Sequence, residues 1–189
     1  MISKQAKTPP LSEKTKILCF DLETNGLHGD AFAVGAVVMD AKGKILDQFT
    51  GRTKIIGQVD PWVEKNVLPA IKDMTITHRN HNDLREAFWK WFLTAESASD
   101  YVLVSNGYPV EYRFLIQCQE ENLEERYWQH PFPILDLFSL IIQAGDVSSI
   151  KAKLRSEMAQ ENLLPHNPFH DAITSAKAAF EAFRLSGRI

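Results

Sequence analysis

One short segment constrains the fold of this chain more than any other, namely the apolar run KILCFD from Lys16 to Asp21, which ends in an acid. A short run without polar alternation is typical of a strand buried on both faces of its sheet. Such a strand needs helices on both sides to cover it. The segment therefore predicts an α/β domain.

The remaining pattern alternates strands with helices. Strands are predicted over 31–39 and 44–53, joined by a turn over 40–43 into an antiparallel hairpin, and again over 101–105 and 133–136. Helices are predicted over about 83–96, 109–120, 149–160 and 168–185, with a loop and short helix within 54–81, and the last predicted strand leads into the segment 137–143. Asn82 is expected to cap the helix from Asp83, and Asn167 with Pro168 to begin the last one.

The length of 189 residues suits one compact domain. Residues 1–15 are polar, carry a Pro9-Pro10 pair and are expected to form a flexible leader, so the domain is expected over 16–189. Cys19 and Cys118 are too few for a disulfide framework and are expected to be buried thiols. A cytoplasmic location and no membrane association follow as expectations.

The formal net charge is −3, which bears on nucleic-acid binding. A protein that coats long nucleic acid is usually strongly basic, because neutralised phosphates supply most of its affinity. The negative net charge argues against an extended, non-specific DNA-binding surface. It remains compatible with an enzyme that holds a few nucleotides at a chain end through metal ions.

The first candidate site is the triplet Asp21-Leu22-Glu23 at the end of the first strand. Residues i and i+2 of an extended chain point to the same side, so both carboxylates leave the strand together while Leu22 points into the core. Two close like charges are unfavourable unless a proton or a cation separates them. Oxygen ligands favour Mg²⁺ or Mn²⁺ over zinc. A solvated turn is the alternative.

Two further acids occupy comparable places. Glu111 is expected in the first or second turn of the helix that follows the strand over 101–105, and Asp171 on the first turn of the last helix, five residues after His166. Small residues at 172, 176 and 179 let this helix approach the sheet and bring Asp171 towards the first strand. Four carboxylates and a histidine base suffice for phosphoryl transfer with two metal ions.

Four segments, in chain order, resemble the motifs of the DEDDh 3′–5′ exonucleases, the DnaQ-like and RNase T-like superfamily. They are FDLETNGL (20–27), SNGYPVEYRFL (105–115), ILDLFSLI (134–141) and HNPFHDA (166–172). The resemblance spans 16 to about 185. It implies a ribonuclease H-like fold with a mixed five-stranded sheet, an antiparallel N-terminal three-stranded part, and helices on both faces.

The resemblance also implies roles for single residues. Asp21, Glu23, Glu111 and Asp171 would bind two Mg²⁺ or Mn²⁺ ions, and His166 would deprotonate the attacking water. Thr24 and Leu27 would contact the terminal nucleotide, and Asn106 matches the asparagine that opens the second motif. The expected partner is the 3′ end of DNA or RNA, with single strands favoured. Homodimers are common among relatives, which makes a homodimer a further expectation.

Glu111 departs from the family pattern, which has aspartate at this place. Glutamate keeps the charge but adds one methylene, and catalysis tolerates little misplacement. Two interpretations follow: an exonuclease that retains activity, or a catalytically weakened module that binds 3′ ends or a protein partner.

Other candidates are given structural interpretations. His170 competes with His166 as the base but is expected on the exposed side of the helix. His78 and His81 are expected at a polar helix start rather than in a zinc site. The four tryptophans, Trp62 included, are expected to serve packing.

Overall fold

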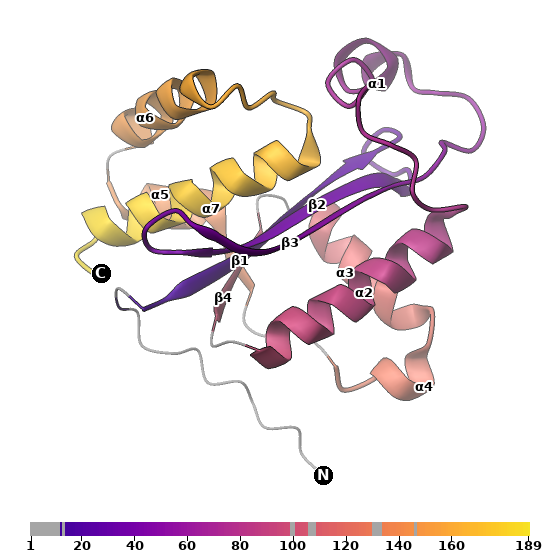
Figure 1. Cartoon of the computed structure of the whole chain (residues 1–189), viewed down its shortest axis with the longest axis horizontal. Helices are drawn as coiled ribbons and strands as arrows, with labels where there is room; N and C mark the ends of the chain where they lie inside the picture. The colour runs from indigo at the N-terminus through magenta and orange to yellow at the C-terminus, as the bar shows by residue number, and fades with distance from the viewer. Residues whose placement is uncertain (1–11, 13, 99–100, 106–108, 130–133, 146) are drawn as a thin grey trace.

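The computed structural model describes residues 12, 14–98, 101–105, 109–129, 134–145 and 147–189. The expected leader lies almost entirely outside these residues. Within them, the chain forms a single five-stranded sheet in the order β3-β2-β1-β4-β5. Figure 1 shows the sheet between two groups of helices.

The sheet is mixed, as the family resemblance implies. Its strands are β1 (Lys16–Thr24), β2 (Ala31–Asp40), β3 (Ile45–Arg52), β4 (Tyr101–Ser105) and β5 (Ile134–Asp136). β1 pairs antiparallel with β2, and β2 antiparallel with β3, which gives the predicted antiparallel N-terminal part. β4 pairs parallel with β1 and with β5. β1 is therefore central, as its continuous apolar run requires.

The helices are α1 (Pro61–Asn66), α2 (His81–Ala98), α3 (Val110–Glu120), α4 (Leu123–Arg126), α5 (Leu137–Gln143), α6 (Val147–Gln160) and α7 (Pro168–Leu185). The predicted helices are all present. The sequence did not predict α4, because a helix of 4 residues is too short to show a helical pattern. None of the helices in the described ranges combines the length and apolarity needed to cross a bilayer.

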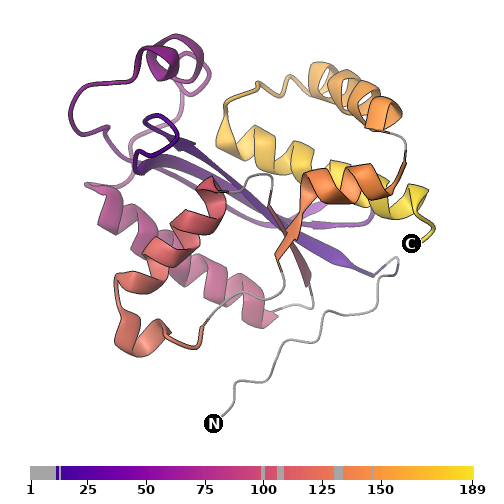
Figure 2. The same ribbon diagram turned by 180° about the vertical axis from the view of Figure 1, so that it is seen from behind.

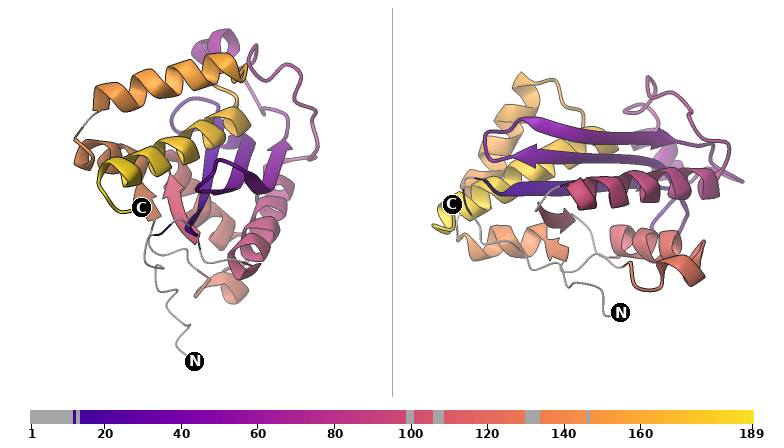
Figure 3. Two further views of the ribbon diagram at one scale, coloured as in Figure 1. Left: turned by 60° about the vertical axis from the view of Figure 1, so that its left-hand side comes forward. Right: turned by 60° about the horizontal axis from the view of Figure 1, so that its bottom comes forward.

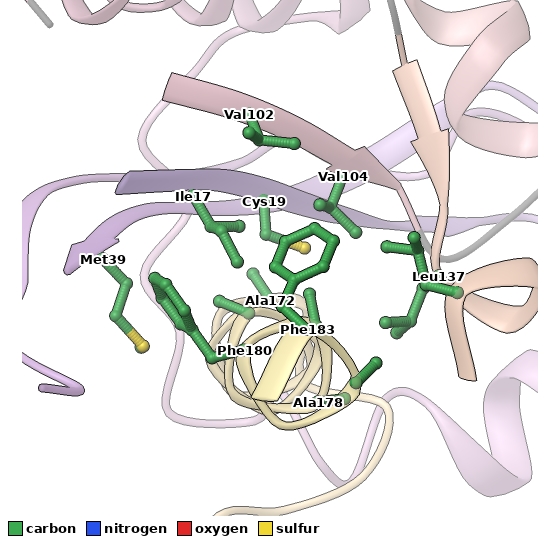
Figure 4. Close-up of a cluster of buried hydrophobic side chains, with 14 of the residues drawn as sticks. Ile17, Cys19, Met39, Val102, Val104, Leu137, Ala172, Ala178, Phe180 and Phe183 are labelled. Atoms are coloured by element: carbon green, nitrogen blue, oxygen red, sulfur yellow. The ribbon is translucent and has the colours of Figure 1, made fainter. Parts of the chain in front are cut away.

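Successive side chains of β1 point to opposite faces of the sheet, so the core is divided into two clusters, one on each face. Ile17 and Cys19 point towards α5 and α7, in the cluster that Figure 4 shows around Phe180 and Phe183. Leu18, Phe20 and Leu22 point the other way, into an aromatic cluster with α2 and α3. Figures 2 and 3 show that the two helical groups lie on opposite sides of the sheet.

One helix start differs from the sequence prediction. The side chain of Asn80 caps α2, since its Oδ1 accepts a hydrogen bond of 2.8 Å from the backbone N–H of Asp83. Asn82, which was predicted for that role, instead donates to Glu121 at 2.9 Å. The helix begins earlier because His81 is buried and its Nδ1 contacts the carbonyl oxygen of Ala31 at 2.9 Å.

The N-terminus of α7 lies against β2 at a glycine. Gly35 pairs with Asp21 across the β1–β2 ladder. A Cβ atom added at Gly35 would lie 2.1 Å from the backbone nitrogen of Phe169, on the first turn of α7. Real Cβ atoms do not approach backbone so closely. Glycine at this position therefore lets the first turn of α7 reach the sheet beside Asp21.

We predict that Gly35→Ala displaces the start of α7. Backbone cannot yield as a flexible side chain does, so the free energy of unfolding should fall by about 1–3 kcal/mol, measurable by urea denaturation. Gly43→Asn is the control, because open space surrounds Gly43 and asparagine tolerates its positive φ of 81°. Equal stability of Gly35→Ala and the parent protein would contradict the close approach.

Candidate active site

The acid pair of the first strand is buried on the α7 side of the sheet. Asp21 and Glu23 are 8% and 7% exposed, while Leu22 between them enters the opposite cluster. The strand geometry predicted from the triplet is therefore confirmed. The register of the β1–β2 ladder shifts between Glu23 and Thr24, so the ladder becomes irregular directly after the acid pair and ends with Thr24 opposite Ala31.

Asp171 joins this pair from the other end of the chain. Asn167 caps α7 through its Oδ1, which accepts from the backbone N–H groups of Phe169 and His170. The cap fixes the first turn, on which Asp171 lies. Oxygen atoms of Asp21, Glu23 and Asp171 all lie within 4.8 Å of one another, and this is the one such cluster of potential metal ligands among the described residues.

Glu111 completes the acidic group from the first turn of α3. Its side chain is 4% exposed, and its charge raises the pKa of both Asp21 and Glu23. Its Oε2 atom is buried and has no hydrogen-bond partner within the described part of the chain. A buried carboxylate oxygen without a partner costs free energy, which a cation at the cluster would offset.

The four acids of the cluster all have raised pKa values, because they are buried. Burial, with the nearby charges of Glu111, Asp171 and Glu23, raises the pKa of Asp21 well above its usual value. Burial and the charges of Asp171 and Glu111 raise the pKa of Glu23 to about 8. Burial raises the pKa of Glu111 to about 7 and that of Asp171 to about 6. Clusters of this kind are typical of functional sites.

His166 lies beside the cluster in a left-handed backbone conformation, with φ of 61°. Its backbone N–H donates to Oδ2 of Asp171 at 2.8 Å. Its imidazole meets the indole of Trp62 edge-on, with ring centroids 5.1 Å apart. A non-glycine residue rarely adopts positive φ, and such conformations gather at functional sites.

The competing histidine has a structural contact. Nδ1 of His170 accepts a hydrogen bond of 2.8 Å from the backbone N–H of Leu164, which closes the loop before α7. Burial lowers the pKa of His170. One ring nitrogen of His170 is therefore committed to the loop.

The predicted substrate-binding residues lie in different settings. Thr24 is half-buried after the register shift, and Leu27 is 58% exposed on the following loop. Asn106 lies outside the described residues. The loop is tied to the segment before α1, because Asn25 donates to the carbonyl oxygen of Gln58 and accepts from the N–H of Asp60.

Three contributors to the site were not recognised from the sequence. Trp62 was assigned to packing, yet it is 54% exposed and contacts His166. Gly35 had no distinguishing pattern within its apolar strand. Arg113 donates to the carbonyl oxygen of Gly29 at 2.6 Å, so α3 holds the loop that carries Leu27. Only a tryptophan next to a helix-capping aspartate, at Asp60-Pro61-Trp62, offered a local signal.

The donor set fits divalent cations that prefer oxygen. Three carboxylates converge, and a fourth offers an oxygen without a partner. Mg²⁺ and Mn²⁺ prefer such all-oxygen sites, whereas zinc sites usually include histidine or cysteine ligands. Asp21, Glu23, Asp171 and Glu111 are the residues that would hold the ions.

Comparisons with known proteins reveal the relationship at the level of structure. No protein-family model matches the sequence, and no curated protein matches it. Among solved structures, zinc-bound exonuclease I of E. coli in complex with single-stranded DNA aligns over 91% of this chain, with a TM-score of 0.56 and 14% identity. Cell-death related nuclease 4 aligns over 91%, with a TM-score of 0.57 and 15% identity.

The chain has the ribonuclease H-like fold of these nucleases. A complex of E. coli exonuclease I with an oligonucleotide gives the same result, over 93% of this chain with a TM-score of 0.54 and 15% identity. The chain spans 40% of exonuclease I in the first complex and 64% of cell-death related nuclease 4. The shared part is therefore the domain described above, and the larger proteins extend beyond it.

We predict that the metal-free protein loses stability as pH rises. The pKa values of Glu23, Glu111 and Asp171 are raised in the folded state, so between about pH 4 and 8 the folded state binds more protons than the unfolded state. Tm measured in EDTA should therefore fall across this range, and Mg²⁺ or Mn²⁺ should raise it most near pH 8.

Asp21→Asn is the control for this prediction. It removes one of the repelling charges at nearly constant volume, so the decline of Tm with pH should be shallower. A Tm in EDTA that rises between pH 5 and 8 would contradict the charge arrangement.

Proposed function

We propose that this chain is a metal-dependent 3′–5′ exonuclease that releases nucleoside monophosphates from nucleic acid. The observation that carries the proposal is the convergence of Asp21, Glu23 and Asp171 within 4.8 Å, beside the buried Glu111, on a fold shared with exonucleases. The cluster lies at the carboxyl end of the central strand β1 and at the start of α7, which is where ligands bind in open α/β sheets.

Asp21, Glu23, Asp171 and Glu111 would hold two Mg²⁺ or Mn²⁺ ions, which would supply Lewis-acid activation of the attacking water and stabilisation of negative charge at the reacting phosphate. The residues themselves fix the reacting groups. Asp171 is held by the N–H of His166, and Asp21 and Glu23 by the sheet, so little reorganisation is needed at reaction.

His166 acts as the general base that accepts the proton of the water. Its imidazole packs edge-on with the indole of Trp62, and its backbone N–H donates to Asp171, which ties the loop to the acidic cluster. An imidazole has an ordinary pKa near neutrality, which suits proton transfer at physiological pH.

The terminal nucleotide is held by the loop after β1. The backbone at Glu23 and Thr24 meets the terminal ribose, and exposed Leu27 contacts the last bases. Exonuclease I of E. coli binds single-stranded DNA on this fold, which favours a single strand as the substrate here.

The test is a nuclease assay resolved to single nucleotides. Purified protein with 5′-labelled single-stranded DNA or RNA should produce a ladder shortened from the 3′ end in Mg²⁺ or Mn²⁺, and none in EDTA. Binding of the same oligonucleotides without degradation in either metal would instead support the binding module that Glu111 suggests.

We predict that Asp21→Asn lowers the hydrolysis rate by more than about 100-fold, because a misplaced metal removes the alignment on which the reaction depends. Asp47→Asn is the matched control on the exposed edge strand β3 and should retain full activity. Circular dichroism would check that both variants are folded. Full activity of Asp21→Asn would refute the assignment of the metal site.

Glu111 yields a separate prediction. Glu111→Asp should leave turnover unchanged or increase it, since it restores the residue of the resembled motif, whereas Glu111→Gln should lower turnover by more than about 100-fold. Steady-state kinetics in Mg²⁺ and Mn²⁺ provide the measurement. Complete loss of activity in Glu111→Asp would mean that the start of α3 is arranged for the longer side chain.

A further inference from the structure

We propose that α4 and the residues directly after it form a docking surface for an arginine-rich segment of a partner protein. Three exposed side chains, those of Leu123, Tyr127 and Trp128, define this surface, named here the α4 surface. It takes no part in the nuclease reaction proposed above.

Large apolar side chains are concentrated on the α4 surface. Trp128 is 76% exposed, more than any other large hydrophobic side chain in the described ranges, and Tyr127 and Leu123 are 58% and 49% exposed. The rings of Tyr127 and Trp128 meet edge-on, with centroids 4.9 Å apart. Tryptophan and tyrosine are enriched among the residues that dominate binding energy at protein interfaces. Their exposure side by side therefore indicates an interaction site.

The aromatic pair is held on a rigid support. Arg126, directly before it, is only 6% exposed and points inwards. Its Nη1 atom donates to the carbonyl oxygen of Cys118 at 2.5 Å, and its Nη2 atom to the carboxylate of Glu86 at 2.7 Å. Its guanidinium lies over the ring of Trp89, 5.7 Å from the centroid. Directly after the pair, Gln129 accepts a hydrogen bond of 3.3 Å from Nε1 of the same indole. Because both flanking residues are anchored, a partner loses little free energy to ordering this segment.

The charge of the α4 surface defines the partner. The segment 119–129 has a net charge of −3 from four glutamates and one arginine: Glu120, Glu121, Glu124, Glu125 and Arg126. The arginine is turned inwards, and Glu121 is paired with Arg85. Glu120 and Glu124 are exposed, and neither forms an ion pair with another residue that the structure describes. A cationic partner would therefore meet exposed carboxylates beside two aromatic rings.

Arginine matches this combination better than any other side chain. Its planar guanidinium stacks on aromatic faces and forms paired hydrogen bonds with carboxylates. Nucleic acid fits less well, because the glutamates repel its phosphates. A second copy of this chain, related by a two-fold axis through the surface, would bring the same glutamates opposite one another. The charges thus favour an arginine-rich segment of a different protein.

The α4 surface is remote from the acidic cluster. α3 carries Glu111 on its first turn and ends before α4 begins. Its 11 residues span about 16 Å at a helical rise of about 1.5 Å per residue. Figures 1 and 2 show α4 and α1 at opposite ends of the molecule. A partner bound at α4 would therefore leave the acidic cluster accessible.

Synthetic peptides test the chemistry of the partner. The probe is a fluorescein-labelled peptide of about 12 residues with the repeat Arg-Leu-Arg, titrated with the full chain and followed by fluorescence anisotropy. We expect a Kd below about 100 µM. The same peptide with lysine in place of arginine should bind at least about threefold more weakly, because an ammonium group cannot stack or form paired hydrogen bonds. A peptide with glutamate in place of arginine should not bind.

Variants test the place of binding. Trp128→Ala and Glu124→Lys should each raise the Kd of the arginine peptide by about tenfold, through loss of an aromatic face and reversal of a charge. Trp62→Ala and Asp47→Lys are the matched controls, since they change an exposed tryptophan and an exposed acid elsewhere. Both should bind the peptide within about twofold of the parent protein. Thermal denaturation would establish that all four variants are folded.

Several outcomes would overturn the proposal. Absence of binding, or equal binding of the arginine and lysine peptides, would exclude recognition of guanidinium groups. Parent-like binding by Trp128→Ala, or a loss in Trp62→Ala as large as in Trp128→Ala, would place the peptide elsewhere. Sedimentation analysis adds one more outcome: a dimer of the parent protein that Trp128→Ala dissociates would identify a second copy as the occupant. Weaker binding of single-stranded oligothymidylate by Trp128→Ala, with peptide binding unchanged, would identify nucleic acid instead.

Discussion

The repulsion among buried carboxyl groups is the constraint on which the rest of this structure depends. Burial raises the pKa of all four acids, and the charges of Glu111 and Asp171 raise the pKa of Asp21 and Glu23 further. Bringing these acids together destabilises the folded state, so other interactions must offset that cost. Burial of the two apolar clusters, one on each face of the sheet, stabilises the fold enough to do so. A cation bound at the cluster would offset the repulsion that the packing imposes on these acids.

The same packing fixes the site from three directions. β1 orients two acids by its alternation, α7 presents Asp171 because Gly35 leaves room for its first turn, and α3 contributes Glu111. Hydrogen bonds from Asn25 and Arg113 then hold the intervening loop to the start of α1 and to α3. Rigid elements thus carry the acids, and a short loop held by hydrogen bonds carries Leu27, which contacts the nucleotide in our proposed function.

The sequence predicted most of the fold because its signals were local. The apolar runs gave the strands, and Asn167-Pro168 gave the start of α7, with its predicted cap confirmed. Positions decided by distant contacts were harder to predict. Asn80 rather than Asn82 caps α2 because His81 is buried against Ala31. The acids were recognised by motif and strand geometry, whereas Gly35 and Trp62 depend on neighbours more than a hundred residues away, Phe169 and His166.

The acidic cluster also has a consequence for how the protein is made. Asp21 and Glu23 belong to the first strand of the sheet, but Asp171 belongs to its last helix, and α7 also supplies much of the core on that face. A ribosome-bound chain that has exposed only its N-terminal strands therefore lacks both a ligand and the burial that gathers the other acids. In our proposal, metal binding at the cluster therefore requires that α7 has been synthesised and has packed against β1.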